Sequence, residues 1–168
     1  DPESSVLLVT IDTLRADALG VYGNPTVATP WIDRLARDGV RFLTAHAHNV
    51  VTFPSHANLL SGLYPLRHGV RDNSGFRFPP ERETLASRLE ARGYATAAFV
   101  SAFPLDSRFG LDHGFGLYDD RLGGAESQLS RAFSVPERSG KDTGAAARAW
   151  LSPNRGRKTC CFVHLYEP

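Results

Sequence analysis

Residues 52–56 read Thr-Phe-Pro-Ser-His and place a hydroxyl group beside the expected start of a short helix. Pro54 suits the first helical position, because its missing N–H costs nothing there, and Gly62 suits the C-terminal cap. The free N–H groups and the dipole of a helix N-terminus attract anions. The Thr52 hydroxyl could therefore attack a phosphate or sulfate ester, although the same pattern also describes an ordinary junction between a loop and a helix.

A carboxylate follows the first apolar segment of the chain. Residues 6–11, Val-Leu-Leu-Val-Thr-Ile, predict a strand that is buried on both faces of a parallel sheet. Asp12 comes directly after this strand, and ligands of open α/β sheets gather outside the carboxyl ends of strands. Asp12 is therefore well placed to bind a metal ion. The simpler alternative is that Asp12 or Thr13 only caps the following helix.

Longer stretches of the chain resemble the sulfatase branch of the alkaline phosphatase superfamily, in that family's order. The matching stretches are residues 7–17, 29–42, 52–62, 63–73, 93–100 and 162–168. The resemblance implies that Asp12 and Thr52 bind a divalent metal ion and that Thr52 is the nucleophile. It also implies an enzyme that hydrolyses small-molecule phosphate or sulfate esters.

The chain departs from true sulfatases at the nucleophile and around it. True sulfatases carry a cysteine or serine that is oxidised to formylglycine, and threonine cannot undergo this conversion. They usually have arginine where this chain has His56, and a Lys-x-His pair where it has Ser101 and Phe103. The pattern is more similar to the phosphodiesterases of the superfamily, which use threonine in a Thr-Phe-Pro-x-His context. We therefore expect phosphate diesters to be favoured over sulfate esters.

Asn73 and His56 are the expected substrate-binding residues. The phosphodiesterases carry an asparagine downstream of the threonine that holds a non-bridging phosphate oxygen, and Asn73 matches that role. Asn73 could instead be a turn residue, since Asp-Asn-Ser-Gly at 72–75 is typical of a turn. His56 is expected to steady the phosphate from the first helical turn. His164, near the carboxyl end of the last expected strand, could support the site or face the substrate.

The expected metal shell is incomplete in this sequence. The family takes further ligands from a downstream Asp-His-Gly, but the Asp-His-Gly at 112–114 falls where the family has a similar stretch without a metal role. Oxygen ligands suit Mg, Ca or Mn, and histidine ligands would favour Zn, so the identity of the metal stays open. We expect residues 1–168 to be the N-terminal part of a sulfatase-like catalytic domain, with little or no activity alone. The alternative is a non-catalytic domain that binds a ligand or partner.

Composition excludes some classes of function. Nineteen basic and eighteen acidic residues give a net charge of +1, which argues against a nucleic-acid partner. No apolar run approaches the length of a membrane span. Cys160 and Cys161 are adjacent in an expected strand, so their side chains point to opposite faces and are expected to be buried and unpaired. These features do not decide between a cytoplasmic and a periplasmic or secreted location.

Alternating strand and helix signals predict a doubly wound, mostly parallel α/β sheet with helices on both faces. The expected strands are residues 6–11, 40–46, 95–101 and 159–165. The expected helices are residues 14–20, 30–38, 54–61, 83–92 and 141–151. Residues 104–140 are rich in Gly, Ser, Pro and charge and are expected to form a long loop or insertion. Exposed strand edges and apolar surface favour self-association of such a chain.

Overall fold

A computed structural model describes residues 4–123 and 136–167 of the protein. These residues divide into two compact units. The larger unit contains the segment up to Asp12 and the residues from His48 onward, and the smaller unit contains residues 13–47. No helix among the described residues is long and apolar enough to cross a membrane.

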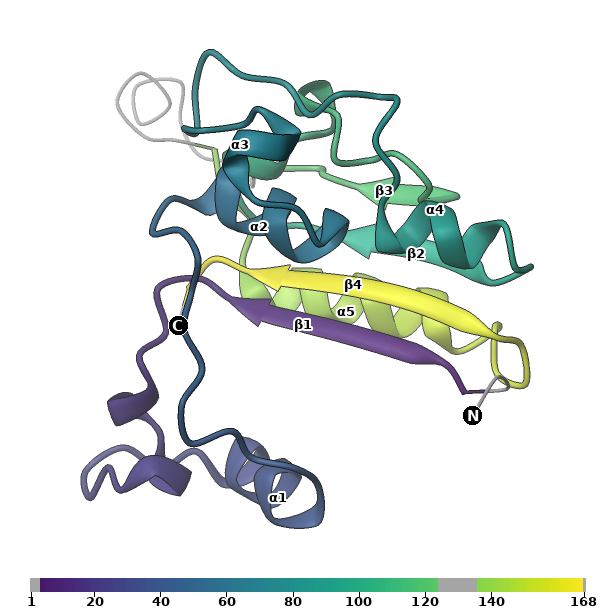
Figure 1. Ribbon diagram of the computed structural model, residues 1–168. Coiled ribbons are helices and arrows are strands. Elements are labelled where there is room, and N and C mark those ends of the chain that lie inside the picture. The colour runs from purple at the N-terminus through teal and green to yellow at the C-terminus, as the bar shows by residue number, and fades with distance from the viewer. Residues whose placement is uncertain (1–3, 124–135, 168) are drawn as a thin grey trace. The chain divides into compact units, whose positions relative to one another are not determined.

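A parallel four-stranded sheet forms the centre of the larger unit (Figure 1). Its strands are β1 (Val6–Ile11), β2 (Ala95–Phe99), β3 (Leu117–Asp119) and β4 (Thr159–Leu165), arranged in the order β1-β4-β2-β3. Every neighbouring pair is parallel, and the register places Thr10 beside His164 and Phe99 beside Val163. The predicted fold class, a parallel α/β sheet covered by helices, is confirmed.

Helices pack on both faces of this sheet because its central strands are apolar on both sides. On one face, α2 (Thr52–Ser61) packs Phe53, Ala57 and Leu60 against Phe162 of β4. On the other face, α5 (Gly140–Leu151) packs around Ala147, against side chains of β2 and β4 that include Cys161. The shorter α3 (Pro65–His68) and α4 (Leu85–Glu90) lie beside α2 (Figure 1).

Both cysteines of β4 are buried and unpaired. Burial raises the pKa of the Cys160 thiol and, together with the neighbouring thiol, raises the pKa of Cys161 to about 12. A thiol that stays protonated is a poor nucleophile and a poor metal ligand. The two side chains therefore serve the core, as their adjacent positions in a strand predicted.

The smaller unit contains one α-helix, α1 (Pro30–Asp38), and two short 3₁₀ helices, Ala16–Ala18 and Gly20–Tyr22. The prediction of a single helix over residues 14–20 was wrong, because Leu19 is extended between the two 3₁₀ turns. The Asp33 carboxylate holds the unit together by accepting hydrogen bonds from the Val21 backbone N–H at 2.7 Å and the Thr29 hydroxyl at 3.0 Å.

The predicted strand at residues 40–46 is absent from the structure. This segment carries apolar side chains, but Val40, Phe42 and Leu43 are between 69% and 83% exposed. Within the described part of the chain no strand pairs with this segment, so apolar composition alone was not sufficient to make a strand here.

Other boundaries also differ from the predictions. Helix α2 begins at Thr52 after an extended Val51, so Pro54 occupies the third helical position. The helix expected over residues 83–92 spans Leu85–Glu90 and begins at a capping box between Thr84 and Ser87. Part of the expected loop at 104–140 is ordered, because β3 adds a fourth strand to the sheet there. Residues 124–135 of that expected loop lie outside the described residues.

Candidate functional site

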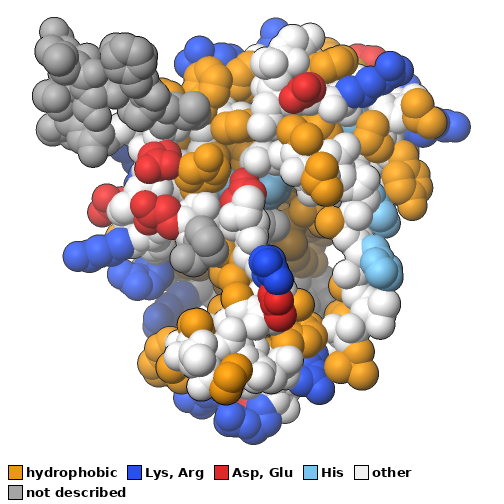
Figure 2. Space-filling model, turned by 90° about the vertical axis from the view of Figure 1, so that its left-hand side faces the viewer, with side chains coloured by type: hydrophobic (Ala, Val, Ile, Leu, Met, Phe, Trp, Pro, Cys, Tyr) orange, Lys and Arg blue, Asp and Glu red, His pale blue; other side chains and the backbone are white. Residues whose placement is uncertain are grey.

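Asp12 and Thr52 meet at the carboxyl end of β1. Asp12 follows the last residue of the strand, and its backbone N–H donates to the Leu165 carbonyl at 2.8 Å, which extends the ladder between β1 and β4. Thr52 is the first residue of α2, and its hydroxyl donates to Asp12 Oδ2 at 2.9 Å. Two residues that are far apart in the chain therefore share a direct hydrogen bond. Figure 2 views this end of the sheet and shows acidic and histidine side chains on the same face.

Asn73 contacts the same helix start. Its side-chain oxygen accepts a hydrogen bond from the Phe53 backbone N–H at 2.8 Å, which satisfies one of the free donors of the first turn. Because the oxygen faces this donor, the amide NH₂ group is turned away from it. Among the described residues no acceptor contacts that NH₂ group, so it is available to an oxygen of a bound ester. Asn73 thus contacts Phe53, the residue directly after the candidate nucleophile Thr52.

His56 is a residue of α2, and both of its ring nitrogens have hydrogen-bond partners in the protein. Nδ1 is 2.7 Å from the Thr52 carbonyl oxygen and must donate to it, so Nε2 accepts from the Thr10 hydroxyl at 3.0 Å. Burial lowers the pKa of His56, while the hydrogen bond to Thr52 and the charge of Asp12 act in the opposite direction. These contacts do not support direct substrate binding by His56. They tie α2 to β1.

Thr10 was not singled out in the sequence, although one signal was available. It lies two residues before Asp12, and residues two apart in a strand project from the same face of the sheet. The Thr10 hydroxyl accordingly faces α2, where it contacts His56.

His164 completes the buried polar group beneath Thr52. It sits beside Thr10 in the ladder, and its Nε2 lies 3.4 Å from Asp12 Oδ2. Its ring is nearly perpendicular to that of His56, with the ring centroids 4.8 Å apart. Burial, with a contribution from the neighbouring His56, lowers the pKa of His164 to about 4, although the Asp12 carboxylate opposes this shift. His164 is therefore neutral near pH 7.

The donor set fits part of a divalent metal site. The Asp12 carboxylate and the Thr52 hydroxyl are adjacent hard oxygen donors, which Mg²⁺, Mn²⁺ and Ca²⁺ prefer. Within residues 4–123 and 136–167, no group of three or more His, Cys, Asp or Glu side chains could hold a metal ion. The described residues thus supply two oxygen donors and no complete shell.

The Asp-His-Gly at 112–114 has a structural role. Gly114 has a φ of +86°, and a Cβ atom at this position would lie 2.2 Å from the Ser87 backbone nitrogen. The Thr84 hydroxyl donates to the His113 carbonyl oxygen at 2.8 Å, which fixes the passage of the chain past the start of α4. Glycine is required by this close approach, and the His113 side chain is exposed.

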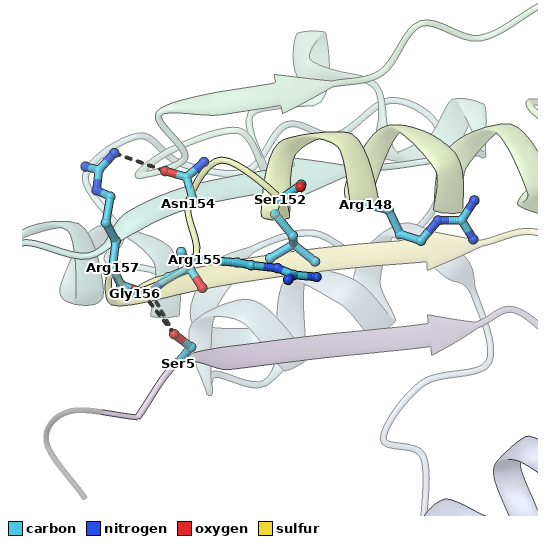
Figure 3. A pocket seen from close by; sticks show the side chains of 9 residues that line it. Ser5, Arg148, Ser152, Asn154, Arg155, Gly156 and Arg157 are labelled. Atoms are coloured by element: carbon cyan, nitrogen blue, oxygen red, sulfur yellow. Dashed lines mark hydrogen bonds between the residues drawn. The ribbon is translucent and has the colours of Figure 1, made fainter.

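A separate cavity of about 500 Å³ lies at the amino end of β1 and β4, away from Thr52 (Figure 3). Ser5 lines it, and its hydroxyl donates to the Arg157 carbonyl at 3.3 Å and accepts from the Thr159 backbone N–H at 3.1 Å. In Figure 3 the side chains of Arg148 and Arg155 extend to one side, and that of Arg157 extends to the other.

The parallel sheet with helices on both faces has the alkaline phosphatase-like α/β fold. A family comparison places the chain within one family of this fold. Residues 4–168 match the sulfatase family model, so the chain belongs to the sulfatase family. Members of this family generally use a divalent metal ion.

Individual relatives agree with this assignment. Mouse steryl-sulfatase is 41% identical over 101 residues, which are 54% of this chain and 16% of that protein. The N-acetylglucosamine-6-O-sulfatase of Bacteroides thetaiotaomicron is 29% identical over 109 residues, which are 65% of this chain and 19% of that protein. The chain therefore spans less than a fifth of the length of either relative.

The fold also matches an enzyme that acts on another class of ester. The crystal structure of the phosphonate monoester hydrolase of Agrobacterium radiobacter superposes with a TM-score of 0.74 at 22% identity. The match covers 98% of this chain and 41% of that one. At this identity the likeness shows a shared fold alone.

Proposed function

We propose that the full-length protein hydrolyses phosphate or sulfate esters through Thr52, with phosphate diesters as its preferred substrates. Residues 1–168 are, in this proposal, the N-terminal part of its catalytic domain. The observation that carries the proposal is the 2.9 Å hydrogen bond from the Thr52 hydroxyl to Asp12 at the start of α2. A hydroxyl held against a carboxylate at a helix N-terminus is placed to attack an anionic ester.

The reaction follows from the groups around Thr52. Thr52 Oγ1 forms a bond to the phosphorus atom while the bond from phosphorus to the departing alcohol oxygen breaks. The hydroxyl proton is directed towards Asp12 Oδ2, and the departing oxygen takes a proton from solvent. Water then cleaves the Thr52 ester, which releases the phosphate product and restores the hydroxyl. The Asn73 NH₂ group donates to a non-bridging oxygen, where negative charge develops.

Asp12 and Thr52 are the residues that would hold a divalent metal ion, with Mg, Mn, Ca and Zn as the candidates. When bound, such an ion supplies positive charge that favours the ionised form of the hydroxyl and offsets the charge of the ester. His56 donates a hydrogen bond to the Thr52 carbonyl oxygen and does not contact the ester in this proposal. Since the described residues supply only two donors, residues 1–168 alone are expected to turn over little or no substrate.

Sulfate ester hydrolysis is the second candidate, and a specific observation favours it. The family model and the curated relatives are sulfatases. Threonine cannot form the aldehyde of formylglycine, so a sulfatase reaction here would have to use the unmodified hydroxyl. A non-catalytic ligand-binding domain is the alternative from another class.

The test is hydrolysis of nitrophenyl sulfate, nitrophenyl phosphate and bis-nitrophenyl phosphate by the full-length protein, with each candidate metal added. The variants are Thr52→Ala, Thr52→Ser, and Ser61→Ala as a control that removes a hydroxyl from the other end of α2. We expect diester cleavage that is lost in Thr52→Ala, retained in part in Thr52→Ser and unchanged in Ser61→Ala. Preferred cleavage of the sulfate would favour the second candidate, and full activity in Thr52→Ala would refute the proposed nucleophile.

A further inference from the structure

His164 is a polar side chain that lies buried on β4. It is fully buried, and neither ring nitrogen has a hydrogen-bond partner among the described residues. Phe162, two residues earlier on the same face of β4, is apolar and packs in the core. Because buried polar groups nearly always have hydrogen-bond partners, an unpartnered imidazole calls for an explanation.

The position of the ring supplies that explanation. Nε2 lies 3.4 Å from Asp12 Oδ2, and the same oxygen accepts a hydrogen bond from the Thr52 hydroxyl at 2.9 Å. The N···O distance is longer than an ordinary hydrogen bond. Catalytic hydrogen bonds are often long without substrate and tighten when it binds. One carboxylate oxygen therefore lies close to both the Thr52 hydroxyl and the buried Nε2 atom of His164.

The neighbouring histidine restricts the alternatives. His56 carries its proton on Nδ1, because that atom faces the Thr52 carbonyl, and its Nε2 is occupied by the Thr10 hydroxyl. His56 therefore has no nitrogen left for His164, and the contact between the two rings is edge to face. The acceptor that remains for His164 is the carboxylate of Asp12.

We propose that His164 is a positioning residue. Its neutral ring carries the proton on Nε2 and donates a hydrogen bond to Asp12, which keeps Oδ2 turned towards the Thr52 hydroxyl. The inference rests on the proposed roles of Asp12 and Thr52. Two other roles make different predictions. If His164 only packs in the core, any ring of this size would serve. If His164 is a ligand of a metal ion, its Nε2 must be unprotonated.

The location of the proton distinguishes donation from a ligand role without any assay of turnover. Full-length protein labelled with ¹⁵N-histidine is studied by long-range ¹H–¹⁵N correlation spectra near pH 7. We expect His164 to be the Nε2–H tautomer and His56, as internal reference, to be the Nδ1–H tautomer. Asp12→Asn is expected to shift the His164 Nε2 resonance. An Nδ1–H tautomer for His164, or no shift in Asp12→Asn, would overturn the proposal.

Substitutions distinguish donation from packing. His164→Gln keeps an N–H donor at about the reach of Nε2, whereas His164→Phe keeps the ring and removes the donor. We expect His164→Phe to lower kcat by about 10–100-fold with KM unchanged, and His164→Gln to retain most of the activity. A His164→Phe enzyme as active as the wild type, with an unchanged unfolding temperature, would refute positioning. If the wild-type protein hydrolyses no ester, the proposed function fails, while the histidine spectra still decide the role of His164.

Discussion

Asn73 offers a substitution that separates catalysis from stability. Its oxygen accepts from the Phe53 N–H at 2.8 Å. In the proposed function its NH₂ group donates to the ester. Asn73→Asp keeps an acceptor for the helix and replaces the NH₂ group by a second carboxylate oxygen. Asn73→Ala removes both functions at once.

The expected magnitudes follow from these contacts. Loss of one donor to the developing charge lowers kcat by about 10²–10³, or about 2.7–4 kcal/mol, and a carboxylate also repels an anionic ester. A carboxylate at a helix N-terminus stabilises by about 0.3–1 kcal/mol. Asn73→Asp is therefore expected to lose activity at equal or higher stability. Asn73→Ala leaves the Phe53 N–H without its acceptor, which costs about 1 kcal/mol in the free energy of unfolding.

The assay pairs the kinetics of the preferred nitrophenyl ester with urea unfolding of the same full-length variants. The kcat of Asn73→Asp is expected to fall at least as far as that of Asn73→Ala, while Asn73→Asp unfolds at a urea concentration no lower than the wild type. Asn73→Asp with kcat within about threefold of the wild type, far less than the loss of an oxyanion donor costs, would show that the amide NH₂ group does not meet the ester. Loss of stability in Asn73→Asp would show that the contact with α2 was assigned wrongly.

Three further predictions concern stability and association. Burial lowers the pKa of His68, so the unfolded chain takes up a proton at a higher pH than the folded chain does. The free energy of unfolding should therefore fall as the pH drops below about 6.5, and urea titrations between pH 5 and pH 8 should show a weaker fall in His68→Gln. Gly114→Ala should lower the free energy of unfolding by about 3 kcal/mol or more, because the added Cβ atom would meet the Ser87 backbone. Gly75 also has a positive φ but no close neighbour, so Gly75→Ala should lower it by about 1 kcal/mol. Equal melting temperatures of the two variants would contradict the clash at Gly114. Leu7 and Val9 are 59% and 48% exposed on edge strand β1, so the 168-residue chain should self-associate. Light scattering after gel filtration should find a monomer only when both residues are changed to lysine.

The sequence was sufficient for the strongly apolar strands and for the helices with clear boundaries. The strand at 6–11 and the helix at 30–38 were predicted at their observed bounds. Both carry strong local signals, an apolar β-rich run in one case and a proline start with a glycine stop in the other. Residues 40–46 show the limit of such signals, since a strand also needs a partner that the local sequence does not reveal.

The same division applies to the candidate site. The sequence by itself determined which side chains could do chemistry, because a threonine before Phe-Pro and an aspartate after a buried strand are local patterns. Only the tertiary structure decided that the Thr52 hydroxyl meets Asp12, that Asn73 contacts the next residue, Phe53, and that His164 lies against Asp12 and His56. These contacts depend on the pairing of β1 with β4 and on the packing of α2 against the sheet. Both involve residues far apart in the chain, and their distances are set by the packed core rather than by sequence spacing.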